Sequence, residues 1–245
     1  MGYKRIFYPK KIFEGDDLDS AFTAIGTAQG SEFNTINPNI EDTLFSGSLE
    51  SVNRNNGRIA SILVDWISAY HELINVDRLT SIITSLKDEE HKWVKVFWCA
   101  NAQRLDKKYL RWKKLASLYP RSNRFNFIDR KKRLNDQGST EFLMNRYGED
   151  DRFIETCIRI PKNTFQHRPT HVFSADKIAK IHGGFKQRLI IGPTCRADMW
   201  AALTKDPTLS PSELADKTYG SYATAHRVKW AYQMVKRDYS DRKRS

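Results

Sequence analysis

The sequence lacks the features that would place the protein in a membrane or outside a reducing compartment. Its 245 residues include three cysteines, which lie far apart and cannot all be paired in disulfides. No apolar run approaches the length that crosses a bilayer, and the basic first residues are not followed by an apolar stretch with a cleavage site. These absences predict a cytoplasmic protein without a membrane partner.

The patterns of common catalytic and metal sites are also missing. The six histidines show neither the H-E-x-x-H spacing nor that of a zinc finger, and the chain has no phosphate-binding loop or G-x-S-x-G nucleophile. His167 and His171 are four residues apart, but Pro169 between them argues against a shared helix face. We therefore expect no enzymatic activity, no metal and no cofactor.

Positive charge, in contrast, is in excess. The chain has 41 Lys and Arg against 29 Asp and Glu, which gives a formal net charge of +12. Such an excess attracts polyanions through electrostatic steering and counterion release. Nucleic acid is therefore the expected partner, and an acidic protein is the alternative.

Helical periodicity dominates the first half of the chain. Between Asn37 and Gln103, apolar residues recur at spacings of three and four, behind the candidate caps Asn39 and Asn56. This pattern predicts a bundle of helices with short connections. A short strand is expected between Phe153 and Pro161.

The charge is concentrated between Arg104 and Arg133, where twelve basic residues face two acidic ones. Aromatic residues are interleaved with this charge, a mixture that suits phosphate contact combined with stacking. The alternative is a solvated helix face followed by a basic loop. The candidate nucleic-acid contacts of this segment are Lys107, Lys108, Arg111, Lys113, Lys114, Arg130, Lys131, Lys132 and Arg133.

A helix with a well-marked start is expected near the C-terminal end. Ser210, Pro211 and Glu213 stand in the order of a capping box, with proline at the first helical position. Upstream, residues 196–204 have the composition of a further compact helix. Together with the segment that follows, these residues predict three consecutive short helices.

The third helix is expected over residues 221–235, after a turn in which Gly220 can take a positive φ and Ser221 can cap. Glu213-Leu-Ala and Ser221-Tyr-Ala-Thr-Ala-His-Arg-Val resemble the helix-turn-helix of bacterial transcription regulators. The resemblance implies that residues 221–235 read the major groove of double-stranded DNA. The implied contacts are Ser221, Tyr222, Thr224, His226, Arg227, Lys229 and Trp230.

The expected fold class is mainly α: a helical bundle N-terminal domain, a C-terminal helix-turn-helix domain and few short strands. The expected parts are an irregular N-terminal arm (1–37), a helical domain with a basic C-terminal segment (38–133), a turn-rich connector with a short strand (134–173) and a helix-turn-helix domain with a basic tail (174–245). The N-terminal helical domain is the expected contact surface for a homodimer or another protein partner.

Three functions fit these features. The first is a transcriptional regulator that binds double-stranded DNA sequence-specifically. The second is an antitoxin or defence-system subunit that acts mainly through protein–protein contacts. The third is an RNA or single-stranded nucleic-acid binding protein that stacks bases on aromatic residues of the basic segment, such as Trp112 and Phe125.

Overall fold

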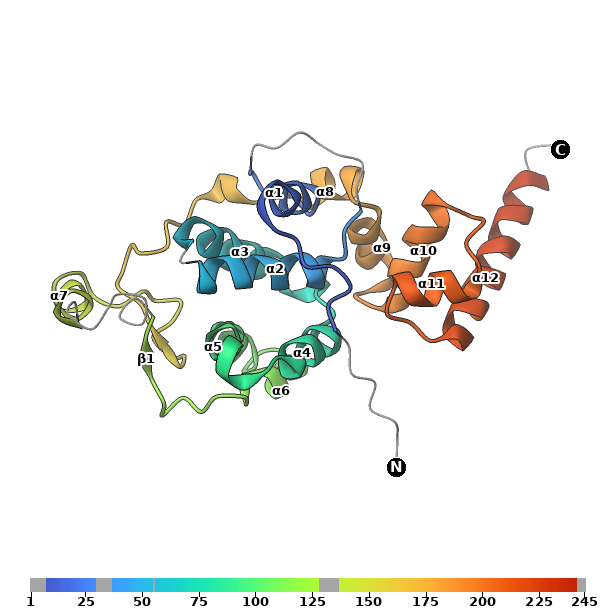
Figure 1. The fold of residues 1–245 in the computed structure, drawn as a ribbon. Helices are drawn as coiled ribbons and strands as arrows, with labels where there is room; N and C mark the ends of the chain where they lie inside the picture. The colour runs from blue at the N-terminus through green and yellow to red at the C-terminus, as the bar shows by residue number, and fades with distance from the viewer. Residues whose placement is uncertain (1–7, 30–36, 55, 128–136, 242–245) are drawn as a thin grey trace, which may run out of the picture.

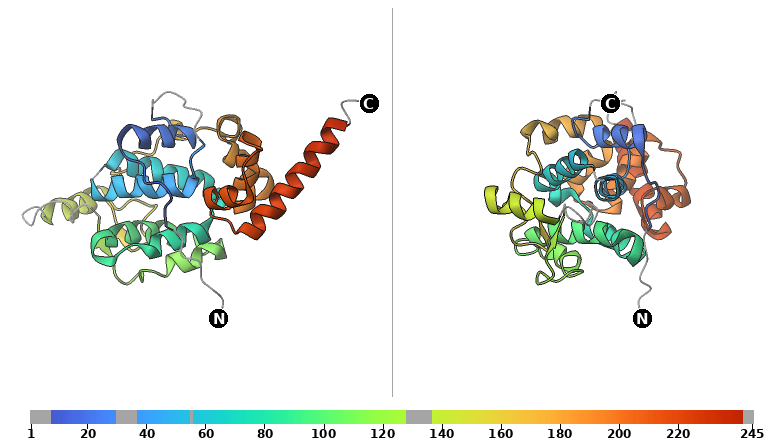
Figure 2. Two further views of the ribbon diagram at one scale, coloured as in Figure 1. Left: turned by 45° about the vertical axis from the view of Figure 1, so that its right-hand side comes forward. Right: turned by 60° about the vertical axis from the view of Figure 1, so that its left-hand side comes forward.

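The computed structural model describes residues 8–29, 37–54, 56–127 and 137–241 (Figure 1). These ranges contain 12 α-helices and one two-stranded parallel sheet, so the predicted mainly α fold is confirmed. Two separate hydrophobic clusters divide the fold. We call the part up to Ile191 the body and the three helices after it the C-terminal module, which lies at one end of the body (Figures 1 and 2).

Four helices with short connections make the centre of the body. They are α2 (Ile40–Asn53), α3 (Gly57–Tyr70), α4 (Val76–Ser85) and α5 (Asp88–Leu105), with a 3-10 turn η1 (His71–Leu73) between α3 and α4. The side chains of Asn39, Asn56 and Asn75 each accept a backbone amide in the first turn of α2, α3 and α4. The predicted caps Asn39 and Asn56 are therefore confirmed, and α4 begins in the same way.

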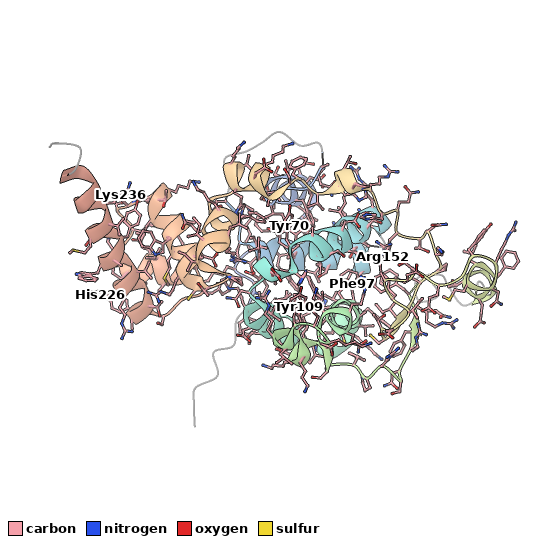
Figure 3. The ribbon with its side chains drawn as sticks, turned by 180° about the vertical axis from the view of Figure 1, so that it is seen from behind. Tyr70, Phe97, Tyr109, Arg152, His226 and Lys236 are labelled. Carbon is pink, nitrogen blue, oxygen red and sulfur yellow. The ribbon has the colours of Figure 1, made fainter. Side chains whose placement is uncertain are left out.

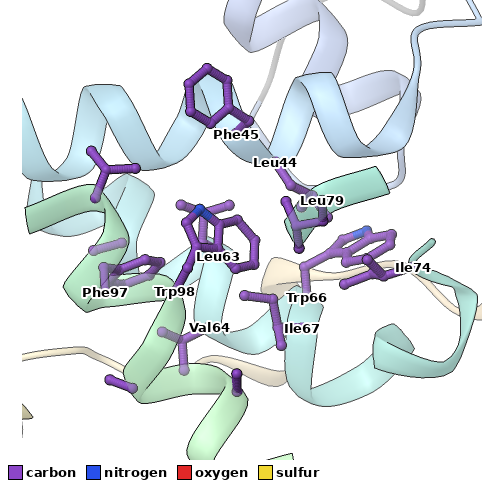
Figure 4. Packing of buried hydrophobic residues seen from close by; sticks show 14 of the residues in the cluster. Leu44, Phe45, Leu63, Val64, Trp66, Ile67, Ile74, Leu79, Phe97 and Trp98 are labelled. Carbon is purple, nitrogen blue, oxygen red and sulfur yellow. The ribbon is translucent and has the colours of Figure 1, made fainter. Parts of the chain in front are cut away.

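Aromatic and aliphatic side chains from these helices fill the core (Figure 4). Trp66 and Trp98 are both fully buried, and each indole N–H has an acceptor. Trp66 Nε1 donates to the carbonyl of Ile25 at 3.0 Å, and Trp98 Nε1 donates to Ser48 Oγ at 2.9 Å. The two tryptophans thus contribute large apolar areas without leaving a buried donor unpaired.

The N-terminal segment contains a core helix, α1 (Gly15–Ala24), where an irregular arm was expected. Leu18 and Phe22 of α1 are buried, and Phe22 packs over Gly47 of α2, where a Cβ atom would lie 2.3 Å from the ring. Residues 15–24 are thus the one short element that the sequence left open within this arm, and they belong to the core. Leu18 and Phe22 are spaced by one helical turn, but turn-forming residues flank them in the sequence. A helix this short depends on its packing against α2 for stability.

The basic segment and the expected connector also pack on the body. Their elements are η2 (Leu110–Trp112), α6 (Lys113–Ala116), β1 (Phe125–Asn126), α7 (Gln137–Tyr147), β2 (Ile158–Arg159) and η3 (Pro169–His171). Strand β2 confirms the predicted strand, and it pairs in parallel with β1, with Phe125 opposite Ile158. The connector was expected to be turn-rich, but α7 is helical and Phe153 is fully buried, so this segment belongs to the body.

Two further helices, α8 (Ala175–Ile181) and α9 (Gly183–Ile191), belong to the body rather than to the C-terminal unit expected over residues 174–245. Ile178 and Phe185 are fully buried in the core of the body. His182 separates the two helices: its Nδ1 accepts from Phe185 N at 2.8 Å, and its Nε2 donates to Pro38 O at 2.9 Å. Burial lowers the pKa of His182 to about 4, so the ring is neutral at pH 7.

The C-terminal module consists of α10 (Cys195–Lys205), α11 (Pro211–Lys217) and α12 (Tyr222–Asp241). Helix α12 has 20 residues and extends beyond the helix expected over residues 221–235. It projects away from the rest of the molecule in Figure 2. Across the described ranges, neither α12 nor any other helix combines the length and the apolar character needed to span a bilayer.

Candidate functional site

The C-terminal module packs around a small apolar cluster of its own. Its buried members are Met199, Leu203, Leu209, Leu214, Ala225, Val228 and Tyr232. At the start of α11, Ser210 Oγ accepts from Glu213 N at 3.2 Å, and Glu213 Oε2 accepts from Ser210 N at 2.8 Å. The predicted capping box is therefore confirmed, with Pro211 as the first residue of the helix.

The turn between α11 and α12 differs from expectation in the residue that takes a positive φ. Tyr219, not Gly220, has a φ of 59°. Gly220 serves a different purpose, because a Cβ atom there would lie 2.0 Å from Met199 Cε of α10. Glycine thus lets the turn pack closely against α10, where a side chain would require the end of Met199 to move, while Tyr219 carries the strained backbone conformation.

Contacts with the body hold Tyr219 in this conformation. Its hydroxyl donates to Asp42 Oδ1 at 2.5 Å and accepts from Lys10 N at 2.6 Å. The guanidinium of Arg78 lies 4.8 Å from the centre of the tyrosine ring. A positive φ costs a non-glycine residue about 1–2 kcal/mol, which these contacts offset.

Beyond the turn, Ser221 caps α12, as its hydroxyl accepts from Thr224 N at 3.1 Å. Ala225 and Val228 face the cluster, so the opposite side of the helix faces solvent. Tyr222 is 59% exposed and Trp230 is 61% exposed. His226, which Figure 3 labels, and Arg227 are exposed as well, so the predicted contacts Tyr222, His226, Arg227 and Trp230 are all accessible on α12.

Three other predicted contacts on α12 are engaged within the module. Thr224 is half-buried, and its hydroxyl lies 2.8 Å from that of Ser221. Lys229 Nζ donates to the carbonyl of Leu209, ahead of α11. Ser221, Thr224 and Lys229 thus serve first to fix the start of α12 and the loop before α11.

The basic segment lies on the body, apart from α12. In Figure 3, Tyr109 of this segment and His226 of α12 occupy different parts of the molecule. Lys107 pairs with Glu155, and Arg111 donates to the carbonyl of His71 at 3.0 Å. Lys108, Lys113 and Lys114 are exposed. Arg130, Lys131, Lys132 and Arg133 lie outside the described residues.

Most aromatic side chains of the basic segment point into the body. Trp112 is fully buried, and Phe127 is 8% exposed. Phe125 is half-buried and meets Trp93 edge to face, with ring centroids 5.3 Å apart. Trp112 is therefore buried away from any base, and Phe125 packs partly against the core, so both rings help to anchor the basic segment.

A buried group of four charged residues, which the sequence did not single out, joins the module to the body. Arg188 of α9 donates to both oxygens of Glu41 of α2, at 2.5 and 2.9 Å, and to both oxygens of Asp198 of α10, at 2.9 and 3.0 Å. Arg78 of α4 donates to Glu41 and to Asp198, each at 2.8 Å. It also donates to the carbonyl of Thr218 at 3.1 Å. We call Glu41, Arg78, Arg188 and Asp198 the charged network.

The two arginines keep the two carboxylates ionised. Burial by itself would raise the pKa of Glu41 and of Asp198, but Arg188 and Arg78 outweigh it and hold both pKa values below their usual range. The side chains of Arg78, Arg188 and Glu41 are at most 2% exposed. A sequence signal did exist, since Arg188 follows the buried Phe185 by three residues on the same face of α9.

A second group missed from the sequence surrounds Asp65 of α3. His167 Nδ1 lies 2.7 Å from Asp65 Oδ1, and His171 Nδ1 lies 2.8 Å from Asp65 Oδ2. The two histidines are thus brought together by a shared carboxylate and not by a helix face. In the part of the chain that the structure describes, no group of three or more His, Cys, Asp or Glu residues is arranged to hold a metal ion.

No protein-family model, curated protein or solved structure matches the chain. The exposed residues of α12 nevertheless include a guanidinium, an imidazole and two aromatic rings on one helix. Such a set can donate hydrogen bonds to phosphates and to base edges.

Proposed function

We propose that the C-terminal module binds double-stranded DNA by inserting the first half of α12 into the major groove. The observation that carries this proposal is the exposed face of Tyr222, His226 and Arg227 on a helix whose other face is buried against α10 and α11. The major groove is about 12 Å wide and admits one α-helix. In helix-turn-helix DNA-binding domains, the second helix of the helix-turn-helix pair lies in the major groove.

Arg227 is the residue assigned to base recognition. Its planar guanidinium can donate two parallel hydrogen bonds to the O6 and N7 atoms of guanine. Tyr222 and His226 lie on the same side, with ring centroids 6.3 Å apart, and supply contacts to phosphates or to the methyl group of thymine. Trp230 lies one turn beyond His226 and marks the far edge of this face.

Long-range attraction comes from the charge of the whole chain. The formal net charge of +12 favours association with DNA at low salt. Lys108, Lys113 and Lys114 of the body add to this field without lying on the face of α12. We therefore assign recognition to α12 and non-specific attraction to the distributed lysines and arginines.

Selection from a pool of randomised duplexes tests this assignment. We expect enriched duplexes to bind more tightly than scrambled ones, and Arg227→Ala to reduce the affinity for the enriched duplex by about 1–3 kcal/mol. Arg58→Ala, at an exposed arginine of α3, is the matched control and should leave the affinity almost unchanged. Absence of an enriched sequence, or equal effects of the two substitutions, would contradict the proposal.

A second candidate function is protein binding through the distal half of α12. It is favoured by the exposed apolar side chains of Trp230, Met234 and Val235. Light scattering tests self-association directly: we expect a dimeric mass that Met234→Ser shifts toward the monomer. A monomeric mass at every concentration would remove self-association as the explanation for this apolar row.

A further inference from the structure

The carboxylate of Asp65 holds two imidazole rings in fixed positions. Its side chain is 4% exposed on α3, and its two oxygens bind Nδ1 of His167 at 2.7 Å and Nδ1 of His171 at 2.8 Å. The backbone amide of Arg168 also donates to Asp65, at 3.4 Å. One buried carboxylate thus ties down the turn from His167 to His171 and makes the two rings neighbours.

Each ring keeps its second nitrogen for other chemistry. Because a carboxylate accepts, Nδ1 of each histidine donates, which leaves a lone pair on Nε2 of the neutral ring. Among the described residues, no group forms a hydrogen bond with Nε2 of His167 or of His171. The side chain of His167 is 65% exposed and that of His171 is 13% exposed. Both rings are therefore placed to take up or release a proton through Nε2.

Arginine side chains lie around this carboxylate. Arg152 Nη1 is 3.6 Å from Asp65 Oδ1, and the same guanidinium donates to both oxygens of Asp150, at 2.9 and 2.6 Å. Burial and the charge of Arg152 lower the pKa of Arg104, which places the first residue of the basic segment near this group. A polyanion that follows the basic segment would thus pass close to the two imidazoles.

Arg168 adds a cation with hydrogen-bond donors to spare. Its side chain is exposed and donates to Gln166 Oε1 through Nη2 at 2.6 Å, while Nε and Nη1 have no partner among the described residues. The three arginines of this group outnumber its two aspartates, so its charge is positive even with both rings neutral. A phosphate in contact with the rings is electrostatically favoured here.

We propose that His167 and His171 cleave single-stranded RNA by general acid–base catalysis. RNA brings its own nucleophile, the 2′-hydroxyl group, so the reaction needs a base, an acid and a cation near the phosphate. The sequence gives no sign of this set, because Asp65 lies 102 and 106 residues before the two histidines. The site is independent of DNA binding by α12, since Arg152 and His226 lie in different parts of the molecule in Figure 3.

Proton transfer between the two rings and the substrate is balanced. Nε2 of the less exposed His171 takes the proton of the 2′-hydroxyl, whose oxygen forms a bond to phosphorus. The bond from phosphorus to the 5′-oxygen breaks, and this oxygen takes the proton that Nε2 of His167 carries at the start. Positive charge is better tolerated on the exposed ring, which assigns the acid to His167. The products are a 2′,3′-cyclic phosphate and a 5′-hydroxyl end, and proton exchange with water restores both rings.

Incubation of the full chain with a fluorescently labelled single-stranded RNA, in the presence of a chelator, tests the activity. We expect cleavage of the RNA and none of a DNA of the same sequence, which lacks the 2′-hydroxyl. By mass spectrometry, the upstream fragment should end in a 2′,3′-cyclic phosphate or in the phosphate formed from it by hydrolysis. Intact RNA, cleaved DNA, or an upstream fragment that ends in a 3′-hydroxyl would overturn the proposal.

Asparagine substitutions separate catalysis from a merely structural tie. The side-chain amide of asparagine can still donate to Asp65, as Nδ1 does, but it has no counterpart of Nε2. His167→Asn and His171→Asn should therefore each slow cleavage about a hundredfold and leave the melting temperature close to that of the wild type. Thr170→Ala, at an exposed residue between the two histidines, is the control and should cleave at the wild-type rate.

A contaminating ribonuclease would cleave equally in every preparation. Equal rates for the wild type and for both asparagine variants would therefore overturn the assignment. Circular dichroism verifies that the variants keep their helices. If His171→Asn does not fold, the exposed His167 decides alone, and a wild-type rate for folded His167→Asn overturns the proposal.

Discussion

The body and the C-terminal module hold their helices by different means. The body has an extended apolar core in which Trp66, Trp98 and Phe97 are fully buried. The module has a small cluster around Leu214 and is fastened to the body through charges, at Arg188 and its partners. Apolar packing therefore accounts for the stability of the body, and polar contacts set where the module sits on it.

This difference matters because the two kinds of contact constrain geometry differently. Apolar packing tolerates small rearrangements that preserve volume. A guanidinium between two carboxylates tolerates little, since each hydrogen bond needs its own distance and direction. The contacts of Arg78 with Asp198 and with the carbonyl of Thr218 thus tie both α10 and the turn before α12 to α4.

The largest effect is expected from Arg188→Met, which breaks the attachment while leaving the apolar clusters intact. Glu41 and Asp198 would then share Arg78 alone, and unpaired buried charge lowers the free energy of unfolding by about 3–5 kcal/mol. Urea denaturation measures the change. Arg58→Met, at an exposed position of α3, is the control. A similar small loss of unfolding free energy in both variants would mean that the charged network does not hold the module.

A second effect of about 3 kcal/mol is expected from pH. Burial raises the pKa of Asp42 from 3.8 to about 6, so between these values the folded protein binds the proton more tightly than the unfolded chain does. The contribution of Asp42 to stability is therefore present at low pH and is lost as the pH rises through 6. Unfolding of the wild type and of Asp42→Asn at pH 4 and pH 7 measures this contribution. The free energy of unfolding of the wild type, relative to that of Asp42→Asn, should be higher at pH 4 than at pH 7.

His182 also titrates between pH 4 and pH 7, so the effect of Asp42 is measured as a difference between the wild type and Asp42→Asn at each pH. Burial lowers the pKa of His182 from 6.5 to about 4, so its contribution to stability is lost as the pH falls through this interval. The two groups oppose each other in the wild type, and His182 is common to both proteins. An unchanged stability difference between wild type and Asp42→Asn at the two pH values would contradict the assignment to Asp42.

A smaller effect, about 1–3 kcal/mol, is expected from Gly220→Ala, which strains the module and leaves the charged network in place. The new methyl group would displace Met199 Cε from its position 2.0 Å away. Gly57→Ala is the matched control, because no atom lies within 4 Å of a Cβ added there. If the two variants unfold at the same urea concentration, the close approach of the turn to α10 is not a constraint.

The smallest effect is expected from Ser210→Ala, which removes one cap of α11. Loss of an N-cap hydroxyl costs about 1 kcal/mol. Faster hydrogen exchange in α11 than in α3 would locate the loss in the module. Ser212→Ala, at an exposed serine two residues further on, should leave the exchange of α11 unchanged or slower.

Local signals explain which parts of the fold could be predicted. The caps Asn39, Asn56 and Ser210 each accept from an amide three residues further along the chain, so the sequence displays both partners together. The exposed face of α12 followed from the same kind of spacing. In the turn, however, the sequence shows Tyr219 and Gly220 side by side, and only the contacts with the body decide that the tyrosine adopts the positive φ.

The features that could not be predicted depend on contacts between residues far apart in the sequence. Arg188 and Glu41 are 147 residues apart, and His171 and Asp65 are 106 apart. In the basic segment, Trp112 resembles a stacking residue until α4 and α5 are seen to cover it. Burial of α1 is likewise decided by α2, on which it packs.

The charged network also orders events during synthesis of the chain. Glu41 and Arg78 are made first, 37 residues apart, and each can neutralise the other as soon as α4 emerges. Arg188 and Asp198 follow 147 and 120 residues after their partners and arrive only ten residues apart. Helices α2 and α4 thus supply one charge-balanced pair, and α9 and α10, in the last quarter of the chain, supply a second balanced pair.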